Sequence, residues 1–219
     1  MRVAIAGAGN VGRAIARELL ENGHQVLLID KDPKALKMDS VPNAEWLLAD
    51  ACEITALDQA KLDGCQVLVA ATGDDKVNLV TSLLGKTEYG VPRVVARVNH
   101  PKNEWMFDSS WGVDVAVSTP RIISALVEEA VSVGDVVRLF SFRKGEANLV
   151  EITLPDTAKC CGRTVSEVEL PENASLAAIV RDGRVITPTP TDVFSAGDEL
   201  LFVASATAEG LIKSCFIAN

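Results

Sequence analysis

The fold is decided by the stretch Arg2-Val-Ala-Ile-Ala-Gly-Ala-Gly-Asn-Val-Gly12, and Val26-Leu-Leu-Ile-Asp30 completes its pattern. The apolar run at residues 3–6 is typical of a buried parallel strand. In the motif that follows it, Gly7 permits a tight turn, Gly9 permits close approach of a pyrophosphate, and Gly12 permits close packing of a helix on the strand. With a second strand and an acid at the required spacing, the motif predicts a dinucleotide-binding unit.

A helix is expected directly after the glycines. Its apolar residues fall at helical spacing (Val11, Ile15 and Leu19), and its charged residues fall on the other faces (Arg13, Arg17, Glu18 and Glu21). Asn22-Gly23 is a typical helix stop. The free backbone amides at the start of this helix are expected to face an anion.

Asp30 stands at the end of the second strand, where a ribose hydroxyl binds in such folds. It could instead cap the next helix. Asp32-Pro33 competes better for that role, since Asp before a first-turn Pro is a strong helix start. We therefore expect Asp30 to be free for a ribose, and its charge disfavours the 2′-phosphate of NADP.

Composition limits the classes of function. The chain has 219 residues, 48% of them hydrophobic and 23% charged, which is ordinary globular composition. A net charge of −9 argues against binding to nucleic acid or to anionic lipid surfaces. No apolar run is long enough to cross a membrane and the N-terminus enters a strand directly, so a cytoplasmic location is expected. The five cysteines lack metal-ligand spacing and predict reduced thiols.

Strand and helix patterns keep alternating through the first half of the chain. Further strands are predicted at residues 46–49, 67–71, 94–98 and 113–117, and a helix is predicted after Thr72-Gly-Asp-Asp75. The fold class is therefore α/β, a Rossmann-like doubly wound parallel sheet of six strands. Its ligand is expected at the carboxyl ends of the strands.

The helix predicted from Thr119-Pro120 to residue 132 has an unusually broad apolar stripe. The stripe consists of two neighbouring rows, namely Ile122, Leu126 and Ala130, and Ile123, Val127 and Val131. The helix could pack on its own sheet, or it could reach a second subunit. The pattern alone does not choose between these alternatives.

A smaller α+β domain is predicted after residues 132–135. Short strands are expected at residues 136–141, 148–154, 176–181, 184–187 and 200–204, before a closing helix. Asp182-Gly183 is a hairpin signal, and the flanking Arg181 and Arg184 are expected to stay in solvent. The predicted division is a nucleotide-binding domain at 1–118, a crossover helix at 119–133 and a C-terminal domain at 134–219.

These motifs together resemble those of the TrkA-like cytosolic regulatory subunits of Trk-type potassium uptake systems, which join an RCK domain to a TrkA-C domain. The resemblance covers nearly the whole chain. Its further marks are Ala49-Asp50-Ala51, Thr72-Gly-Asp-Asp75-x-x-Asn78, Ala96-Arg97-Val98, Ile179-Val-Arg181, Pro188 and Gly197-Asp198-x-Leu200. It implies that Asp50 lies near the adenine and Arg97 on the ligand side of the fifth strand. The predicted binding residues are Gly7, Gly9, Asn10, Val11, Gly12, Asp30, Lys31, Asp50, Ala51, Thr72, Gly73, Asp74, Asn78 and Arg97.

The resemblance implies a gating subunit that senses NAD(H), or alternatively ATP/ADP or AMP, without turning it over. Its implied partner is a membrane potassium-translocating subunit of the TrkH, TrkG or KtrB kind, at the inner face of the cell membrane. A homodimer through the 119–132 helix would assemble into a ring, and some members bind a cyclic dinucleotide in the C-terminal half. Ala49 replaces the family's usual Gly. Asn10 stands where some ATP-gated relatives carry Arg, which favours NAD(H).

The alternative function is an NAD-dependent dehydrogenase or reductase. Such an enzyme needs a general acid or base beside the nicotinamide. The sole tyrosine, Tyr89, lacks a Tyr-x-x-x-Lys spacing, and His24 and His100 lie in predicted loops. Asp74 and Asp75 could cap a helix as readily as contact a ligand. The sequence therefore favours a non-catalytic sensor, with no catalytic or metal-ligating set.

Overall fold

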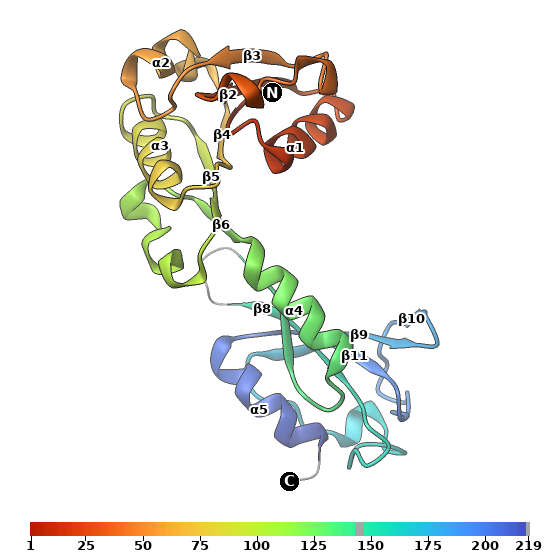
Figure 1. Ribbon diagram of the computed structural model, residues 1–219. Coiled ribbons are helices and arrows are strands. Elements are labelled where there is room, and N and C mark those ends of the chain that lie inside the picture. Colours follow the sequence, from red (N-terminus) through yellow and green to blue (C-terminus); the bar gives the residue numbers. More distant parts are fainter. Residues whose placement is uncertain (143–146, 218–219) are drawn as a thin grey trace. The chain divides into compact units, whose positions relative to one another are not determined.

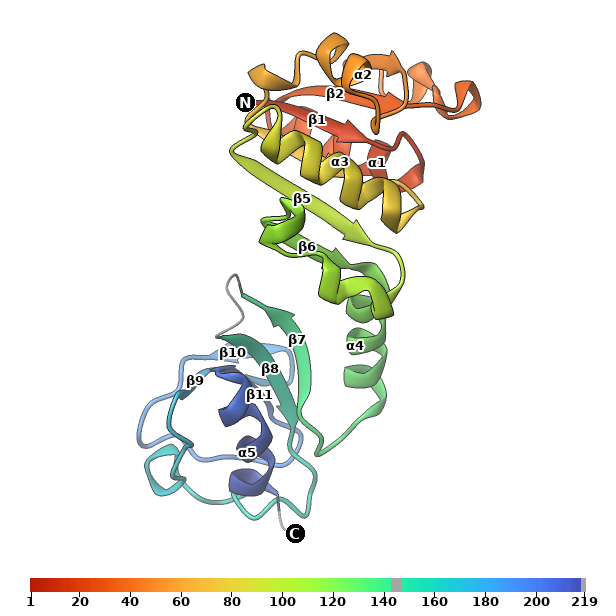
Figure 2. The same cartoon turned by 90° about the vertical axis from the view of Figure 1, so that its left-hand side faces the viewer.

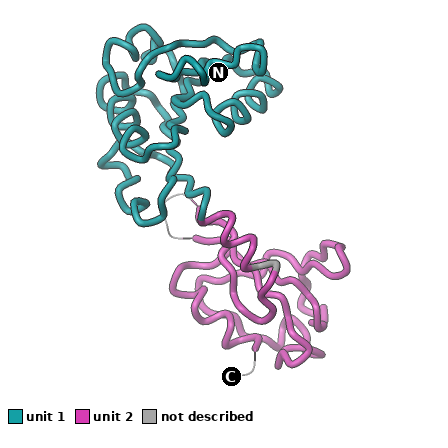
Figure 3. The backbone as a smooth tube through the Cα atoms, in the orientation of Figure 1, with its two compact units in different colours: residues 1–120 teal, residues 121–219 magenta. Residues whose placement is uncertain are grey.

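The computed structural model describes residues 1–142 and 147–217, with only the backbone of residues 129 and 130. The chain forms two compact units, Met1–Pro120 and Arg121–Asn219 (Figure 3). The predicted division at residues 118 and 133 stays a prediction. Within the described residues, no helix is long and apolar enough to span a membrane.

The first unit is built on a six-stranded parallel sheet in the order β3-β2-β1-β4-β5-β6 (Figure 1). The predicted doubly wound sheet is confirmed, and most strand bounds move by a residue or two. The strands are β1 (Arg2–Ala6), β2 (Gln25–Asp30), β3 (Glu45–Leu48), β4 (Val67–Ala70), β5 (Arg93–Val98) and β6 (Val115–Ser118). After β3 the chain returns to the other side of β1, so the strand order reverses between β1 and β4. Ligands bind in the crevice at such a reversal.

Helices cover both faces of this sheet (Figure 2). On one face α1 (Asn10–Glu21) packs Ala16 among Val3, Ile5 and Leu28. On the other face α2 (Ile54–Gln59) and α3 (Asp75–Thr87) cover a second core. Short 3-10 segments complete the unit, namely η1 (Pro33–Ala35), η2 (Met38–Ser40), η3 (Leu62–Gly64), η4 (Pro101–Met106) and η5 (Ser109–Trp111). The helices cover the two faces of the sheet, and the loops after the strands lie at its carboxyl edge.

The second unit is an antiparallel sheet in the order β10-β9-β11-β8-β7. Its elements are β7 (Val137–Ser141), β8 (Asn148–Thr153), η6 (Val165–Glu167), β9 (Ala174–Arg181), β10 (Arg184–Ile186), β11 (Glu199–Ala204) and α5 (Ala206–Phe216). Phe216 of α5 makes edge contacts with Phe194 and Phe202 in the core. Asp182 and Gly183 both have positive φ, +50° and +71°, as a type I′ hairpin requires. The predicted α+β module and its hairpin are confirmed.

Arg181 is not solvated as predicted. Its Nε lies 2.6 Å from Oδ1 of Asp198, and its Nη2 lies 2.8 Å from Oδ2. The Asp198 side chain is fully buried, so the fork-shaped guanidinium neutralises a carboxylate that water does not reach. The pairing of β9 with β11 brings Arg181 next to Asp198, and the local sequence does not reveal this pairing.

Helix α4 (Thr119–Val131) exposes both predicted apolar rows. Ile123, Leu126 and Val127 are each more than half exposed. Ala130, a member of one row, has no described side chain. The helix already includes Thr119, so this residue lies inside the first turn and not before it as a cap. The observed exposure does not support packing of the stripe on the helix's own sheet, and the second-subunit alternative stays a prediction.

Candidate functional site

An open cavity of about 620 Å³ lies at the carboxyl edge of the parallel sheet, at the reversal between β1 and β4. Its walls come from the end of β2, from the loops after β1, β2, β3 and β4, from the first turns of α1 and α3, and from one residue of β5. The lining residues are Gly7, Gly9, Asn10, Val11, Ile29, Asp30, Lys31, Ala49, Asp50, Ala51, Ala71, Thr72, Gly73, Asp74, Val77 and Arg97.

The three fingerprint glycines occupy different environments. A Cβ on Gly12 would lie 1.8 Å from the carbonyl oxygen of Gly7, so this position permits the close helix–strand packing. Gly7 has a φ of +104°, and a Cβ there would lie 2.9 Å from the backbone of Ala71 and Thr72. A Cβ on Gly9 would meet nothing within 4 Å, so the space over Gly9 belongs to the cavity.

The start of α1 is arranged for an anion. In this fully described helix, Gly9 is the N-cap without a side-chain cap, and no acidic residue lies in the first turn. The positive end of the helix dipole, at the first backbone amides, is therefore not compensated by a side chain of the helix. Asn10 and Val11 both line the cavity. The spacing of Val11 suggested that it packs against the sheet, but its side chain is exposed at the cavity instead.

Arg13 is buried, although its spacing places it on a different face of the helix from the apolar row. Only 9% of the residue is exposed. Its guanidinium donates to the carbonyl oxygen of Ala8 and, at 2.7 Å, to Oδ1 of Asn10. Helical spacing placed Arg13 correctly on the helix, but a long side chain can turn back toward the N-terminus and reach residue i−3.

Asp30 is not free as predicted, although it lines the cavity. Its Oδ2 accepts the backbone amide of Ala8 at 2.7 Å, and its Oδ1 accepts the amide of Asp32 at 2.9 Å. Asp32 accepts from Lys34 and caps η1, as expected. Each Asp30 oxygen retains a second lone pair, so the carboxylate ties the first loop to the second strand while it can still accept from a hydroxyl.

Lys31 and Asp50 form an ion pair on the wall beside Asp30, with Nζ and Oδ2 3.2 Å apart. The amide of Cys52 donates to the other Asp50 oxygen at 3.0 Å. This amide and the Lys31 ammonium hold the pKa of the Asp50 carboxyl below its ordinary value, and the hydrogen bond to Asp50 raises the pKa of Lys31. Both groups are therefore charged at neutral pH.

Asn78 supports the cavity without lining it. It is fully buried, and its Oδ1 accepts both the amide and the hydroxyl of Thr72, at 2.9 and 2.6 Å. Its Nδ2 donates to the carbonyl oxygen of Arg97 at 2.8 Å. Asn78 thereby joins the carboxyl ends of β4 and β5. Asp74 lines the cavity and also caps α3 by accepting from Lys76, so both of its predicted roles are geometrically possible together.

Asp75 has a structural role. The sequence allowed it either to cap a helix or to contact a ligand. Its buried carboxylate accepts four hydrogen bonds, from the amides of Asn99 and His100 and from the side chains of Asn99 and Asn103. Burial acts to raise the pKa of Asp75, but these donors outweigh it and lower that pKa. The carboxylate thus fastens the loop after β5 to the start of α3.

Arg97 reaches the cavity from β5. Its buried Nε has no hydrogen-bond partner among the described residues. A buried donor of this kind is stabilised when an acceptor reaches it. The cavity therefore has carboxylates near β2 and β3, and a guanidinium at its β5 end.

All predicted site residues line the cavity except Gly12 and Asn78, which support it from behind. Contact of any of them with a ligand stays a prediction. Sequence reasoning missed four apolar members, namely Ile29, Ala49, Ala71 and Val77. The first three stand at strand ends, so the position of the strand ends was the signal that could have found them.

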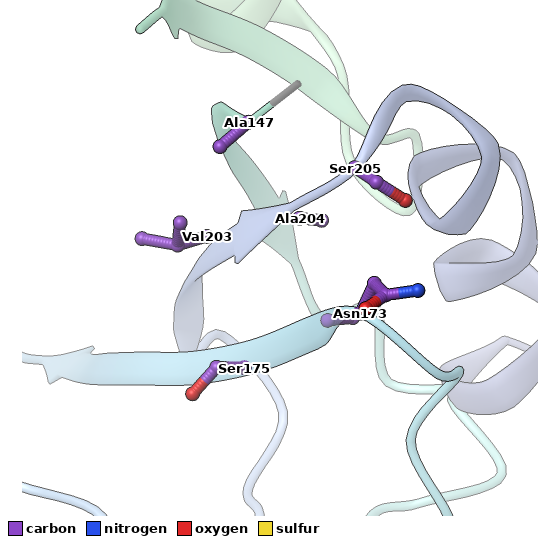
Figure 4. Close-up of a pocket in the computed structure, with 7 residues that line it drawn as sticks. Ala147, Asn173, Ser175, Val203, Ala204 and Ser205 are labelled. Atoms are coloured by element: carbon purple, nitrogen blue, oxygen red, sulfur yellow. The ribbon is translucent and has the colours of Figure 1, made fainter.

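The second unit has a separate hollow of about 490 Å³ (Figure 4). It lies between the start of β9 and the end of β11. Its lining residues are Ala147, Asn173, Ala174, Ser175, Val203, Ala204 and Ser205. None of these lining residues is charged, unlike several of those that line the cavity in the first unit.

Fold and cavity together define a Rossmann-type nucleotide-binding protein with an additional antiparallel domain. Residues 3–119 match the family model of the TrkA-N domain, and residues 149–213 match that of the TrkA-C domain. The chain therefore belongs to the TrkA family, as its resemblance suggested.

Sequence relatives agree with this assignment, and a solved structure shares the fold. The chain is 57% identical to the Trk system potassium uptake protein TrkA of Mycobacterium tuberculosis, over 95% of each protein. It is 29% identical to a TrkA homolog of Methanothermobacter thermautotrophicus, again over 95% of each. Its fold matches a GsuK channel bound to NAD with a TM-score of 0.68 at 15% identity, over 98% of this chain and 39% of that one.

Proposed function

We propose that this protein is a cytosolic nucleotide-sensing regulatory subunit that gates a Trk- or Ktr-type potassium transporter without turning over its nucleotide. The observation that carries the proposal is the cavity over Gly9, where an uncapped helix start faces the same space as the Asp30 carboxylate. The M. tuberculosis relative, a Trk system potassium uptake protein, supports the potassium part.

NAD(H) is the ligand that we favour over ATP, ADP or AMP. The pyrophosphate would lie over Gly9, and Asp30 would accept from the adenosine ribose. Asp50 would lie beside the adenine. Arg97 and Thr72 then remain for a second nucleoside, which mononucleotides lack. The GsuK channel bound to NAD and a Kef domain from Shewanella denitrificans in an AMP-bound form share this fold with TM-scores of 0.68 and 0.52.

A dehydrogenase is not favoured by the cavity's chemistry. Among the described lining residues there is no His, Tyr or Cys, and Lys31 is engaged with Asp50. Hydride transfer to or from a hydroxyl or carbonyl needs a group that can exchange a proton near neutral pH. The homologues' names also fit a protein without catalytic turnover.

Gating requires an assembly that converts ligand binding into motion. We propose a homodimer through the exposed face of α4, further assembly into a ring, and docking to a membrane potassium-translocating subunit at the inner face of the cell membrane. The nucleotide must bind two conformations with different affinity, because equal affinity shifts no equilibrium. If a cyclic dinucleotide binds the C-terminal domain, the hollow beside Asn173 is where we expect it.

Growth at low potassium tests the proposal. Deletion of the gene should impair growth, the wild-type gene should restore it, and Gly9→Ala should not. Gly64→Ala is the matched control, because Gly64 does not line the cavity and a Cβ there meets only one side-chain atom at 4.0 Å. Rescue by a Gly9→Ala protein shown not to bind nucleotide would separate the ligand from the function. Turnover of NAD(H) with a small substrate would move the protein to the enzymes.

A further inference from the structure

We propose that Arg13 is a positioning residue for the phosphate site, which acts by fixing the direction of the Asn10 side-chain amide. The proposal rests on the nucleotide-binding function proposed above and names a determinant of that same site. Arg13 lies one turn after Asn10 in α1, behind the cavity wall, and its guanidinium joins Asn10 Oδ1 to the carbonyl oxygen of Ala8.

The direction of the Asn10 amide follows from the chemistry of arginine. A guanidinium only donates hydrogen bonds, so the Asn10 atom at 2.7 Å from Nη2 must be the carbonyl oxygen. The amide nitrogen, a double donor, is then on the side away from Arg13. Because Asn10 lines the cavity, this nitrogen can offer its hydrogens to a phosphate oxygen bound there. Without Arg13 the amide could rotate and offer its own oxygen, which repels phosphate.

The burial of Arg13 indicates a role other than that of a charged residue on the exposed face of a helix. Among the residues that the structure describes, no carboxylate forms an ion pair with its guanidinium, and both acceptors are neutral oxygens. A buried cation without a counter-ion is costly. Here it lies beneath an uncapped helix start, where its charge and the helix dipole both favour an anion. An anionic ligand would therefore relieve the cost that the free protein carries.

Arg13→Met tests the proposal, because it keeps the length of the side chain and removes the donors. Arg17→Met is the matched control, with the same change one turn further along the same helix, at an exposed position. The probes are ADP and adenosine, with affinities followed by NMR titration of the full-length protein. We expect Arg13→Met to weaken ADP at least tenfold and adenosine less than twofold, and Arg17→Met to change neither by more than twofold.

A double-mutant cycle tests whether Arg13 acts through Asn10. Once Asn10→Ala has removed the amide, adding Arg13→Met should weaken ADP by less than threefold further. Fully additive losses would overturn the proposal, as would equal affinities in Arg13→Met and Arg17→Met. If the wild-type protein binds neither probe and does not bind NADH, the proposed function fails as well, which is a different result.

A second variant keeps the test decisive if Arg13→Met does not fold. Asn10→Asp keeps the shape of the side chain and pairs with Arg13, but it presents an oxygen on both sides. We expect it to bind ADP at least fivefold more weakly than Asn10→Ala does. Binding equal to or tighter than that of Asn10→Ala would show that the direction of the amide does not matter.

Discussion

Gly9→Ala and Gly12→Ala should separate ligand binding from folding, although both add one methyl group near the start of α1. At Gly12 the new Cβ would lie 1.8 Å from the Gly7 carbonyl oxygen, so the backbone itself would have to shift. Overpacking of this severity costs about 3 kcal/mol, and the better helix propensity of Ala returns about 1 kcal/mol. We expect a net loss of at least about 2 kcal/mol in the unfolding free energy.

At Gly9 the expected outcome is the reverse. The backbone there has φ −66° and ψ −171°, which Ala adopts freely, and the Cβ meets nothing within 4 Å. The unfolding free energy should stay unchanged or rise by up to about 1 kcal/mol. A phosphate oxygen must come to about 2.9 Å of an amide nitrogen to bind it, and the methyl group obstructs that approach. Loss of one charge-assisted contact of about 2–3 kcal/mol corresponds to roughly 30- to 150-fold weaker binding.

Urea denaturation and calorimetric titration with NADH measure the two effects on the same preparations. Gly64→Ala again serves as the control that should alter neither property strongly. The reasoning is refuted if Gly9→Ala binds NADH as tightly as the wild type, because the pyrophosphate would then not lie over this residue. It is equally refuted if Gly12→Ala is as stable as the wild type.

Three further outcomes are expected. Asp30→Ala should weaken NADH by about 1.5–3 kcal/mol in calorimetry, and because it also frees two backbone amides it should lower the melting temperature; unchanged affinity in a folded variant would contradict the ribose role. Asp75→Asn should cost about 2–4 kcal/mol at pH 7. Because the folded pKa of Asp75 lies below its unfolded value, this stabilisation is present above about pH 4 and is lost as the pH falls through the folded pKa, so urea melts should converge in acid. Leu126→Asp should produce monomers or insoluble protein, and a monomeric wild type in light scattering would exclude the dimer.

The sequence predicted the parallel sheet well because its evidence is local. Each apolar run and the glycine motif span only a few residues, and the acid stands directly at the end of the second strand. The edge of a sheet that carries the ligand follows from topology once the strands are known. The glycine motif and Asp30 named the first part of the cavity wall from the residues themselves, and the resemblance to the TrkA-like subunits named Asp50 and Arg97.

The errors concern side chains whose partners are distant or whose direction periodicity does not fix. Arg181 finds Asp198 only because β9 and β11 are neighbours. The burial of Arg13 was not predicted, because helical spacing gives the Cα position and not the course of a long side chain. Asp30 was expected to be free because Asp32 was the better cap for the next helix, but the amide that occupies Asp30 belongs to Ala8 in the glycine loop.

The contrast between Gly9 and Gly12 has an evolutionary consequence. A lineage that no longer needed its nucleotide could replace Gly9 by drift, because the free fold tolerates a side chain there. The same lineage would have to keep Gly12, because the contact of that residue with the Gly7 carbonyl belongs to the fold itself. In a set of descendants, Gly12 therefore reports common architecture, whereas Gly9 reports that a ligand is still under selection.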